Sequence, residues 1–115
     1  MIKRKDERLS EIKQNVKDGA GKIVFNYIAS SDELFNKIKM YSTISLKKDC
    51  GIGYHRHDGE EEIILVLEGK AQYNDDGVIS EIYPGDVTIC EDGHSHSIAN
   101  INDEELIAVA MVLYK

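Results

Sequence analysis

Short apolar segments separated by turn residues follow one another from residue 39 to the end of the chain, and they limit what the chain can fold into. The segments are rich in Val, Ile, Tyr and Thr, which favours strands over helices. Gly, Asn and Asp cluster between them, as at residues 74–77 and 84–86. The predicted strands are residues 40–46, 53–57, 62–67, 71–74, 78–82, 87–90, 95–100 and 106–113. Many short strands with glycine-marked turns indicate an all-β sandwich or barrel.

The first part of the chain has a different pattern. Residues 6–17 carry Leu9, Ile12 and Val16 at spacings of three and four among charged side chains, which predicts a short amphipathic helix. A strand is expected next at residues 23–28. At 115 residues the chain is expected to form one domain. Within it we expect residues 1–20 to be an N-terminal extension and residues 40–113 to form the barrel.

Two of the predicted strands are apolar on both faces. Residues 63–67 and 106–113 carry almost only Ile, Leu, Val, Ala and Met. A sheet with a single buried face alternates apolar and polar residues instead. Something therefore has to cover the second face, either the N-terminal strand and helix or a second copy of the chain. We expect a homodimer.

The net charge and the cysteine content limit the binding partners and the cellular compartment that we expect for this protein. The formal net charge is −7, which argues against an extended contact with nucleic acid or an anionic membrane surface. The two cysteines, Cys50 and Cys90, are far apart and indicate neither a disulfide framework nor a zinc knuckle. No apolar run reaches the ~20 residues of a bilayer span, and no export signal follows the basic start. A cytoplasmic location is expected.

All four histidines fall in two pairs, His55 with His57 and His94 with His96. Residues two apart on a strand project to the same side of a sheet, so each pair can present both rings together. An acidic run at residues 60–62 lies close to the first pair. Imidazole with carboxylate suits Mn, Fe, Co, Ni, Cu or Zn better than Ca or Mg. Spacing alone does not choose among the three glutamates.

The stretch from Asp49 to Asn100 resembles the two sequence motifs of the cupin superfamily. The first motif, G-x5-H-x-H-x(3,4)-E-x6-G, matches residues 49–69, with Asp49 in place of the first glycine. The second, G-x5-P-x-G-x2-H-x3-N, matches residues 85–100, with Glu91 in place of the proline. The resemblance implies a small single-domain cupin, an all-β, double-stranded β-helix (jelly-roll) barrel, here with a short N-terminal helix.

By the same resemblance, the metal ligands are His55, His57, Glu62 and His96. They would hold one divalent transition metal ion, Mn, Fe, Ni, Co or Zn, and leave Glu60 and Glu61 in solvent. His94 is not a motif position. It shares strand parity with His96, so it is a candidate acid–base residue facing the cavity or, alternatively, an exposed loop histidine. Tyr73 could reach the cavity, but we expect it to serve in packing.

Two hypotheses for the function follow. The first is a metal-dependent cupin that acts on a small carbonyl, sugar or carboxylate compound, as an isomerase, decarboxylase or dioxygenase. The alternative is a non-catalytic module that binds or senses a small ligand or metal in the same cavity. Both take a small-molecule ligand, and neither the substrate nor the metal follows from the sequence.

Overall fold

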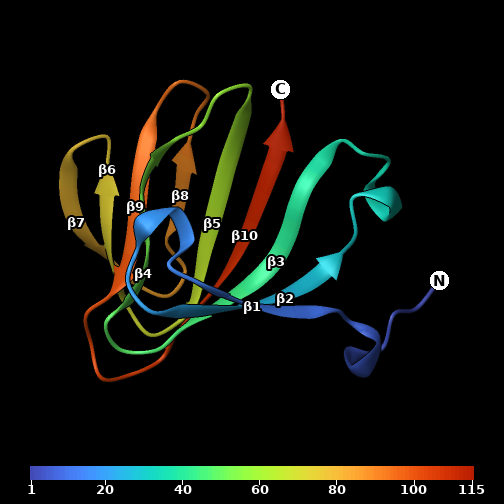
Figure 1. Ribbon diagram of the computed structural model, residues 1–115, viewed down its shortest axis with the longest axis horizontal. Coiled ribbons are helices and arrows are strands. Elements are labelled where there is room, and N and C mark those ends of the chain that lie inside the picture. Colours follow the sequence, from blue (N-terminus) through green and yellow to red (C-terminus); the bar gives the residue numbers. More distant parts are fainter.

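Two antiparallel sheets face each other across a common core in the computed structural model, which describes residues 1–115. The larger sheet is formed by β1 (Ser10–Gln14), β2 (Lys22–Ala29), β3 (Ile38–Leu46), β5 (Glu60–Glu68), β8 (Val87–Cys90) and β10 (Leu106–Tyr114). The smaller sheet is formed by β4 (Cys50–Arg56), β6 (Ala71–Asp75), β7 (Val78–Ile82) and β9 (Ser95–Asn100). The orders are β1-β2-β3-β10-β5-β8 and β4-β9-β6-β7 (Figure 1).

The predicted all-β class is confirmed, and each strand predicted from residue 40 onward is present. No strand pairing joins the two sheets into a closed ring. The predicted barrel is therefore a flattened sandwich with open edges. None of its helical segments is long and apolar enough to cross a membrane.

The N-terminal helix predicted for residues 6–17 is wrong. The segment holds a 3-10 turn, η1 (Lys5–Glu7), then β1 and a second 3-10 turn, η2 (Val16–Asp18). Strand β1 adds to the edge of the larger sheet by pairing with β2. Leu9 and Ile12 are 73% and 66% exposed, so the apolar spacing that suggested a helix does not face the core. Pairing with a sheet edge overrides a local helix pattern of this length.

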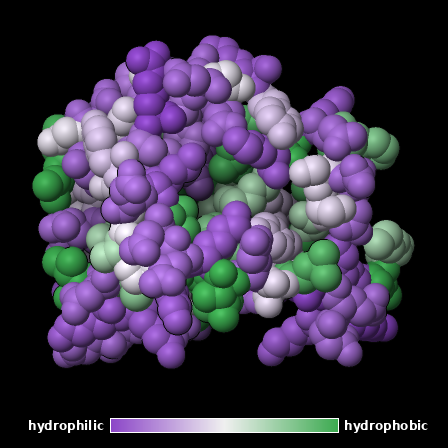
Figure 2. Space-filling model, viewed as in Figure 1, coloured by the Kyte–Doolittle hydropathy of each residue, from purple (hydrophilic) through white to green (hydrophobic).

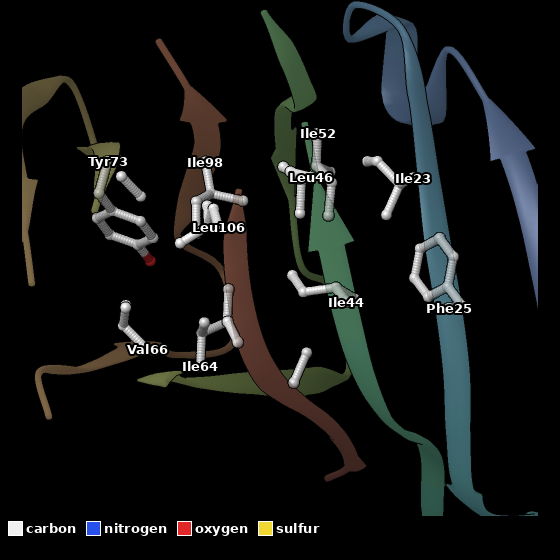
Figure 3. Close-up of a cluster of buried hydrophobic side chains, with 13 residues drawn as sticks. Ile23, Phe25, Ile44, Leu46, Ile52, Ile64, Val66, Tyr73, Ile98 and Leu106 are labelled. Carbon is white, nitrogen blue, oxygen red and sulfur yellow. The ribbon is translucent and has the colours of Figure 1, made fainter. Parts of the chain in front are cut away.

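The core lies between the sheets and is built mainly from the inward-facing alternate residues of their strands. Its largest fully buried apolar side chains are Ile23, Ile44, Leu46, Ile64, Ile98, Leu106 and Val66. Figure 3 shows these side chains pointing toward one another from both sheets, with the Tyr73 ring among them. Each such side chain contributes about 1.5–3 kcal/mol of hydrophobic stabilisation. The core thereby fixes how the two sheets, and the polar side chains at one end of them, are placed.

The outer face of the larger sheet is apolar as well. Residues of β5, β8 and β10 that point away from the core lie side by side across the pairings of these strands. We call this set the outer patch; it comprises Ile63, Leu65, Val87, Ile89, Ile107, Val109 and Met111. Val87 and Ile89 are more than half exposed, and the others are half-buried. No other segment of this chain covers the patch. The N-terminal segment, which was one of the two expected covers, pairs with the edge of the sheet instead.

Asp49 occupies a position that favours glycine. It lies between β3 and β4 with a φ of 62°, in the left-handed region. The corresponding cupin motif position is a glycine, the residue that adopts this region without steric cost. Aspartate is one of the few other residues that tolerate the left-handed region. The mismatch with the motif therefore leaves the turn intact.

Candidate metal centre

Three strands from the two sheets bring the predicted ligands together. His55 lies on β4 and pairs directly with His96 on β9 in the smaller sheet. His57 follows the end of β4, and Glu62 projects from β5 of the larger sheet. His57, Glu62 and His96 are buried, and His55 is half-buried. The site therefore exists only where the two sheets meet.

Three ring nitrogens and one carboxylate converge on a common centre. The ligand atoms that the four residues offer all lie within 4.8 Å of one another. The Nε2 atom of His57 is 3.1 Å from Nε2 of His55 and 3.0 Å from Nε2 of His96. Oε1 of Glu62 is 3.1 Å from Nε2 of His57 and 2.9 Å from Nε2 of His96. These four residues could hold one metal ion.

The other nitrogen of each ring has a separate partner. Nδ1 of His55 lies 2.7 Å from the carbonyl oxygen of Gly53. Nδ1 of His57 lies 2.9 Å from Oε1 of Glu60, and Nδ1 of His96 lies 2.7 Å from the hydroxyl of Tyr73. Partners of this kind fix the orientation of a metal-binding imidazole and select which nitrogen faces the ion.

These partners show that the donor set fits a cation. The Gly53 carbonyl can only accept, so His55 carries its proton on Nδ1 and turns the lone pair of Nε2 toward the centre. The ionised Glu60 selects the same tautomer for neutral His57. Nitrogen lone pairs 3.1 Å apart repel each other unless a positive charge lies between them. Imidazole nitrogens together with a carboxylate are a ligand set for a divalent transition metal.

The spacing of the donors also bears on the coordination geometry. Two donors at about 2.1 Å from one ion lie about 3.0 Å apart at a right angle and about 3.4 Å apart at a tetrahedral angle. Four of the six separations among these atoms are 2.9 to 3.1 Å, which is close to the value for a right angle. A right angle belongs to five- or six-coordinate ions. On such an ion, four protein ligands leave one or two positions for another molecule.

Electrostatic interactions keep Glu62 ionised, and burial keeps His55 neutral, the form in which it can bind a metal. Burial favours the neutral form of Glu62, but hydrogen bonds from His57 and His96 outweigh it and lower the pKa of Glu62 to about 2. Burial lowers the pKa of His55, which keeps that ring neutral. The hydrogen bond with Glu62 raises the pKa of His57, and Glu60 adds to the effect. In the absence of an ion, a proton on His57 would supply the positive charge that offsets the Glu62 carboxylate and the facing nitrogen lone pairs.

Two side chains in direct contact with the cluster were not expected there. Glu60, predicted to be solvated, is mostly buried and bonds to His57 and to Nζ of Lys39, which is 3.0 Å away. Tyr73, predicted to pack, is buried in the core, and its hydroxyl reaches His96. Glu60 follows His57 by three residues, and the turn between β4 and β5 brings the two side chains into contact. No local signal marks Tyr73, because its contact depends on β6 pairing with β9.

His94 lies outside the cluster. It precedes β9, is exposed, and places its Nδ1 atom 2.8 Å from Oδ2 of Asp76. Glu91, at the motif's proline position, is exposed too, and its carbonyl accepts a hydrogen bond from the His94 backbone. Glu61 is partly exposed and is not one of the four residues of the cluster. The strand parity that suggested a cavity position for His94 does not apply, because the strand begins one residue later.

A pocket of about 230 Å³ opens onto the cluster. His55, His57, Glu60 and Glu62 are among its lining residues. Apolar residues of β2, β3, β4, β10 and η2 form the rest of the wall together with three lysines, Lys13, Lys17 and Lys39. At ~30 Å³ per water molecule, the pocket has the volume of roughly eight waters. It suits a ligand of a few non-hydrogen atoms. Figure 2 shows apolar side chains recessed within a mostly hydrophilic surface on the face that it displays.

Comparisons with known proteins identify similar chains. A family model described as the cupin domain matches residues 42–112. The oxalate-binding protein of Thermotoga maritima is 30% identical over 113 residues, which are 98% of this chain and 93% of that protein. A crystal structure from Thermotoga maritima, described as a "predicted oxalate decarboxylase", has a TM-score of 0.94 at 30% identity and covers 100% of both chains.

A more distant structure is informative about the fold alone. A Klebsiella pneumoniae protein described as having a double-stranded β-helix domain has a TM-score of 0.70 at 20% identity, and the match covers 86% of this chain and 83% of that one. Together with the nearer matches, this likeness confirms the double-stranded β-helix (jelly-roll) prediction.

Proposed function

The chain belongs to the cupin family, and from that premise we propose that His55, His57, Glu62 and His96 bind one divalent transition metal ion. The observation that carries the proposal is the convergence of three Nε2 atoms and one carboxylate, each ring held by a separate partner on its Nδ1 atom. The right-angled spacing favours Mn, Fe, Co or Ni over a closed tetrahedral Zn site.

The ligand of this centre is a small carboxylate, with oxalate as the first compound to test. A bound divalent ion would supply Lewis acidity and open positions for carboxylate oxygens. The pocket beside the cluster has a volume of about 230 Å³, which is ample for a compound of this size. The Thermotoga maritima relative, named for binding oxalate, is similar over nearly the full length of both chains.

The chain's own residues orient the metal ligands and line the pocket beside them. Gly53, Glu60 and Tyr73 hold the three rings through their Nδ1 atoms. Phe25 and Val112 belong to the apolar wall of the pocket, which strengthens electrostatic contacts inside it.

Binding without turnover is the function that we favour over decarboxylation or isomerisation. Both glutamates that line the pocket are engaged with histidines, so neither is a free proton donor. His94, the acid–base candidate, is not among the lining residues. Decarboxylation is the second candidate, because the "predicted oxalate decarboxylase" shares the whole fold.

The test measures metal content and ligand binding together. Protein purified without an affinity tag or chelator is assayed for bound metal, and its affinities for Mn²⁺ and then for oxalate are measured by calorimetry. We expect one ion per chain in the wild type, a large loss in His57→Ala and in Glu62→Gln, and full metal content in the matched control His94→Ala. Stoichiometric metal in both ligand variants would refute the assignment. Release of CO2 and formate from oxalate would favour the second candidate.

The assembly that we propose is a homodimer formed through the outer patch. The larger sheet exposes there a continuous apolar surface that nothing in one chain covers. We further propose that residues 1–115 act as one cupin domain in the cytoplasm. The two free thiols, Cys50 half-buried and Cys90 buried, suit a reducing compartment. The excess of acidic residues disfavours nucleic acid and anionic membranes as partners.

A further inference from the structure

The turn between β1 and β2 has an unusual backbone. Asn15, Lys17 and Asp18 have φ values of 52°, 53° and 62°, all in the left-handed region that residues other than glycine rarely adopt. Each of these conformations costs free energy, and such residues persist only where the surrounding structure holds them in place. Three such residues in one turn indicate that contacts with the rest of the protein stabilise this conformation.

Backbone contacts hold this turn against β4, next to the metal centre. The carbonyl of Ala20 accepts a hydrogen bond of 2.9 Å from the Gly51 backbone. A side chain on Gly19 would clash with the Gly51 carbonyl, and one on Gly53 would clash with the Lys17 carbonyl. Gly53 is also the residue whose carbonyl holds His55. The turn is therefore anchored two residues away from a proposed metal ligand.

The anchored turn places Lys17 in the wall of the pocket that contains His55, His57 and Glu62. Two other lysines line this pocket, but each has a partner. Lys39 pairs with Glu60 at 3.0 Å, and Lys13 lies 3.8 Å from Glu11 and 5.1 Å above the Phe25 ring. Lys17 forms no ion pair. In a protein of net charge −7, it is the one unpaired cation in this wall.

We infer that Lys17 recognises the second carboxylate of a dicarboxylate ligand whose first carboxylate lies at the metal centre, an inference that rests on the proposed function. The two acidic groups of the wall, Glu60 and Glu62, are already engaged with histidines. An unpaired ammonium group in the same pocket as a divalent ion matches the charge of a small dianion. A monoanion of the same size uses only one of the two cations, so Lys17 sets a preference for dianions.

Oxalate and oxamate provide the test, because they have nearly the same shape and differ in one carboxylate. Calorimetry measures the affinity of each for Mn²⁺-loaded wild type, Lys17→Asn and Lys17→Arg, and the affinity of each apoprotein for Mn²⁺. Asparagine tolerates the left-handed conformation, so Lys17→Asn removes the charge and keeps the turn. Lys37→Asn, at an exposed lysine that does not line the pocket, is the matched control for net charge.

We expect Lys17→Asn to bind oxalate at least tenfold more weakly than the wild type, with oxamate and Mn²⁺ affinities within twofold. Lys17→Arg and Lys37→Asn should resemble the wild type. Unchanged oxalate binding in Lys17→Asn, or an equal loss for oxalate and oxamate, would overturn the role of Lys17 while the metal site stands. Loss of Mn²⁺ binding in Lys17→Asn would overturn it in favour of a structural role. A wild type that takes up no Mn²⁺, or binds Mn²⁺ but no oxalate, would overturn the proposed function and this inference with it.

Discussion

Side chains that contact the Nδ1 atoms of the histidines determine which nitrogen of each ring faces the proposed ion. The hydroxyl of Tyr73 is the clearest case, because Tyr73 is buried and its hydroxyl lies 2.7 Å from Nδ1 of His96. We expect this tyrosine to keep Nε2 of His96 directed at Glu62, 2.9 Å away.

Tyr73→Phe should therefore weaken metal binding without changing the ligand set. Removal of the hydroxyl leaves a buried ring nitrogen without a partner and frees the orientation of His96. Loss of such a partner lowers metal affinity by about 10–100-fold. Mn²⁺ titration calorimetry measures the effect, with Tyr83→Phe as the control because the hydroxyl of Tyr83 bonds to Glu81 on the surface. Equal affinities in the two variants would contradict this role.

Asp49 gives a second prediction for a single position. Because its φ of 62° is in the left-handed region, a β-branched residue there is strained. We expect Asp49→Val to lower the free energy of unfolding by on the order of 1–2 kcal/mol, and Asp49→Gly to leave it within about 1 kcal/mol of the wild type. Urea unfolding provides the measurement. Asp103→Val, at a residue without a positive φ, is the control, and an equal loss in both valine variants would count against backbone strain.

The four residues of the cluster could be predicted because the cupin motifs record both their identity and their spacing. Their supporting contacts could not be predicted to the same extent. Glu60 looked like one member of a solvated acidic run, and only the folded turn brings it to His57. The contact of Tyr73 with His96 joins residues 23 positions apart through strand pairing, which no local pattern encodes.

At the scale of elements, strand β1 shows where local pattern and fold disagree. Its five residues are all exposed, and it joins the sheet by pairing with β2. The strands from residue 40 onward were predictable because β-branched and aromatic residues are concentrated in them and turn residues separate them. Of the three apolar residues in N-terminal residues 6–17, Leu9 and Ile12 are exposed and only Val16 packs against the core, so their spacing did not mark a buried helix face.

The contact between Tyr27 on β2 and Glu11 on β1 gives this edge a dependence on alkaline pH. Burial raises the pKa of Tyr27 to about 12, and its hydrogen bond of 2.7 Å to Glu11 adds to the rise. Because the folded pKa lies above the ordinary value of 10, the contribution of Tyr27 to stability is complete below pH 10 and is lost as the pH rises toward 12.

We expect Glu11→Gln to make tyrosinate form at lower pH. Ultraviolet absorbance followed from pH 9 to 13 measures the titration, with the curve of Tyr27→Phe subtracted to isolate this residue. Glu68→Gln, at an exposed carboxylate on another strand, is the control. An unshifted titration in Glu11→Gln would mean that burial alone accounts for the raised pKa.

At the scale of the whole molecule, the outer patch distinguishes a monomer from a dimer. We expect sedimentation equilibrium to give a mass of about twice 12.9 kDa. Val109→Glu, in the middle of the patch, should convert the dimer to a monomer because it buries a charge in the interface. Val78→Glu makes the same exchange on an exposed strand of the other sheet and should leave the dimer intact. A wild-type monomer at micromolar concentration would refute the assembly.

The placement of the cluster across both sheets ties metal binding to the folding of the chain. His57 and His96 are 39 positions apart, and Glu62 comes from the opposite sheet. An ion held by all four residues is a crosslink that can close only after the sheets have docked, and it must be released before they can separate. Metal binding is then coupled to the global opening of the protein. The ion would slow hydrogen exchange in the core strands of both sheets, while the β1 edge, which contributes no ligand, would exchange at the same rate with or without it.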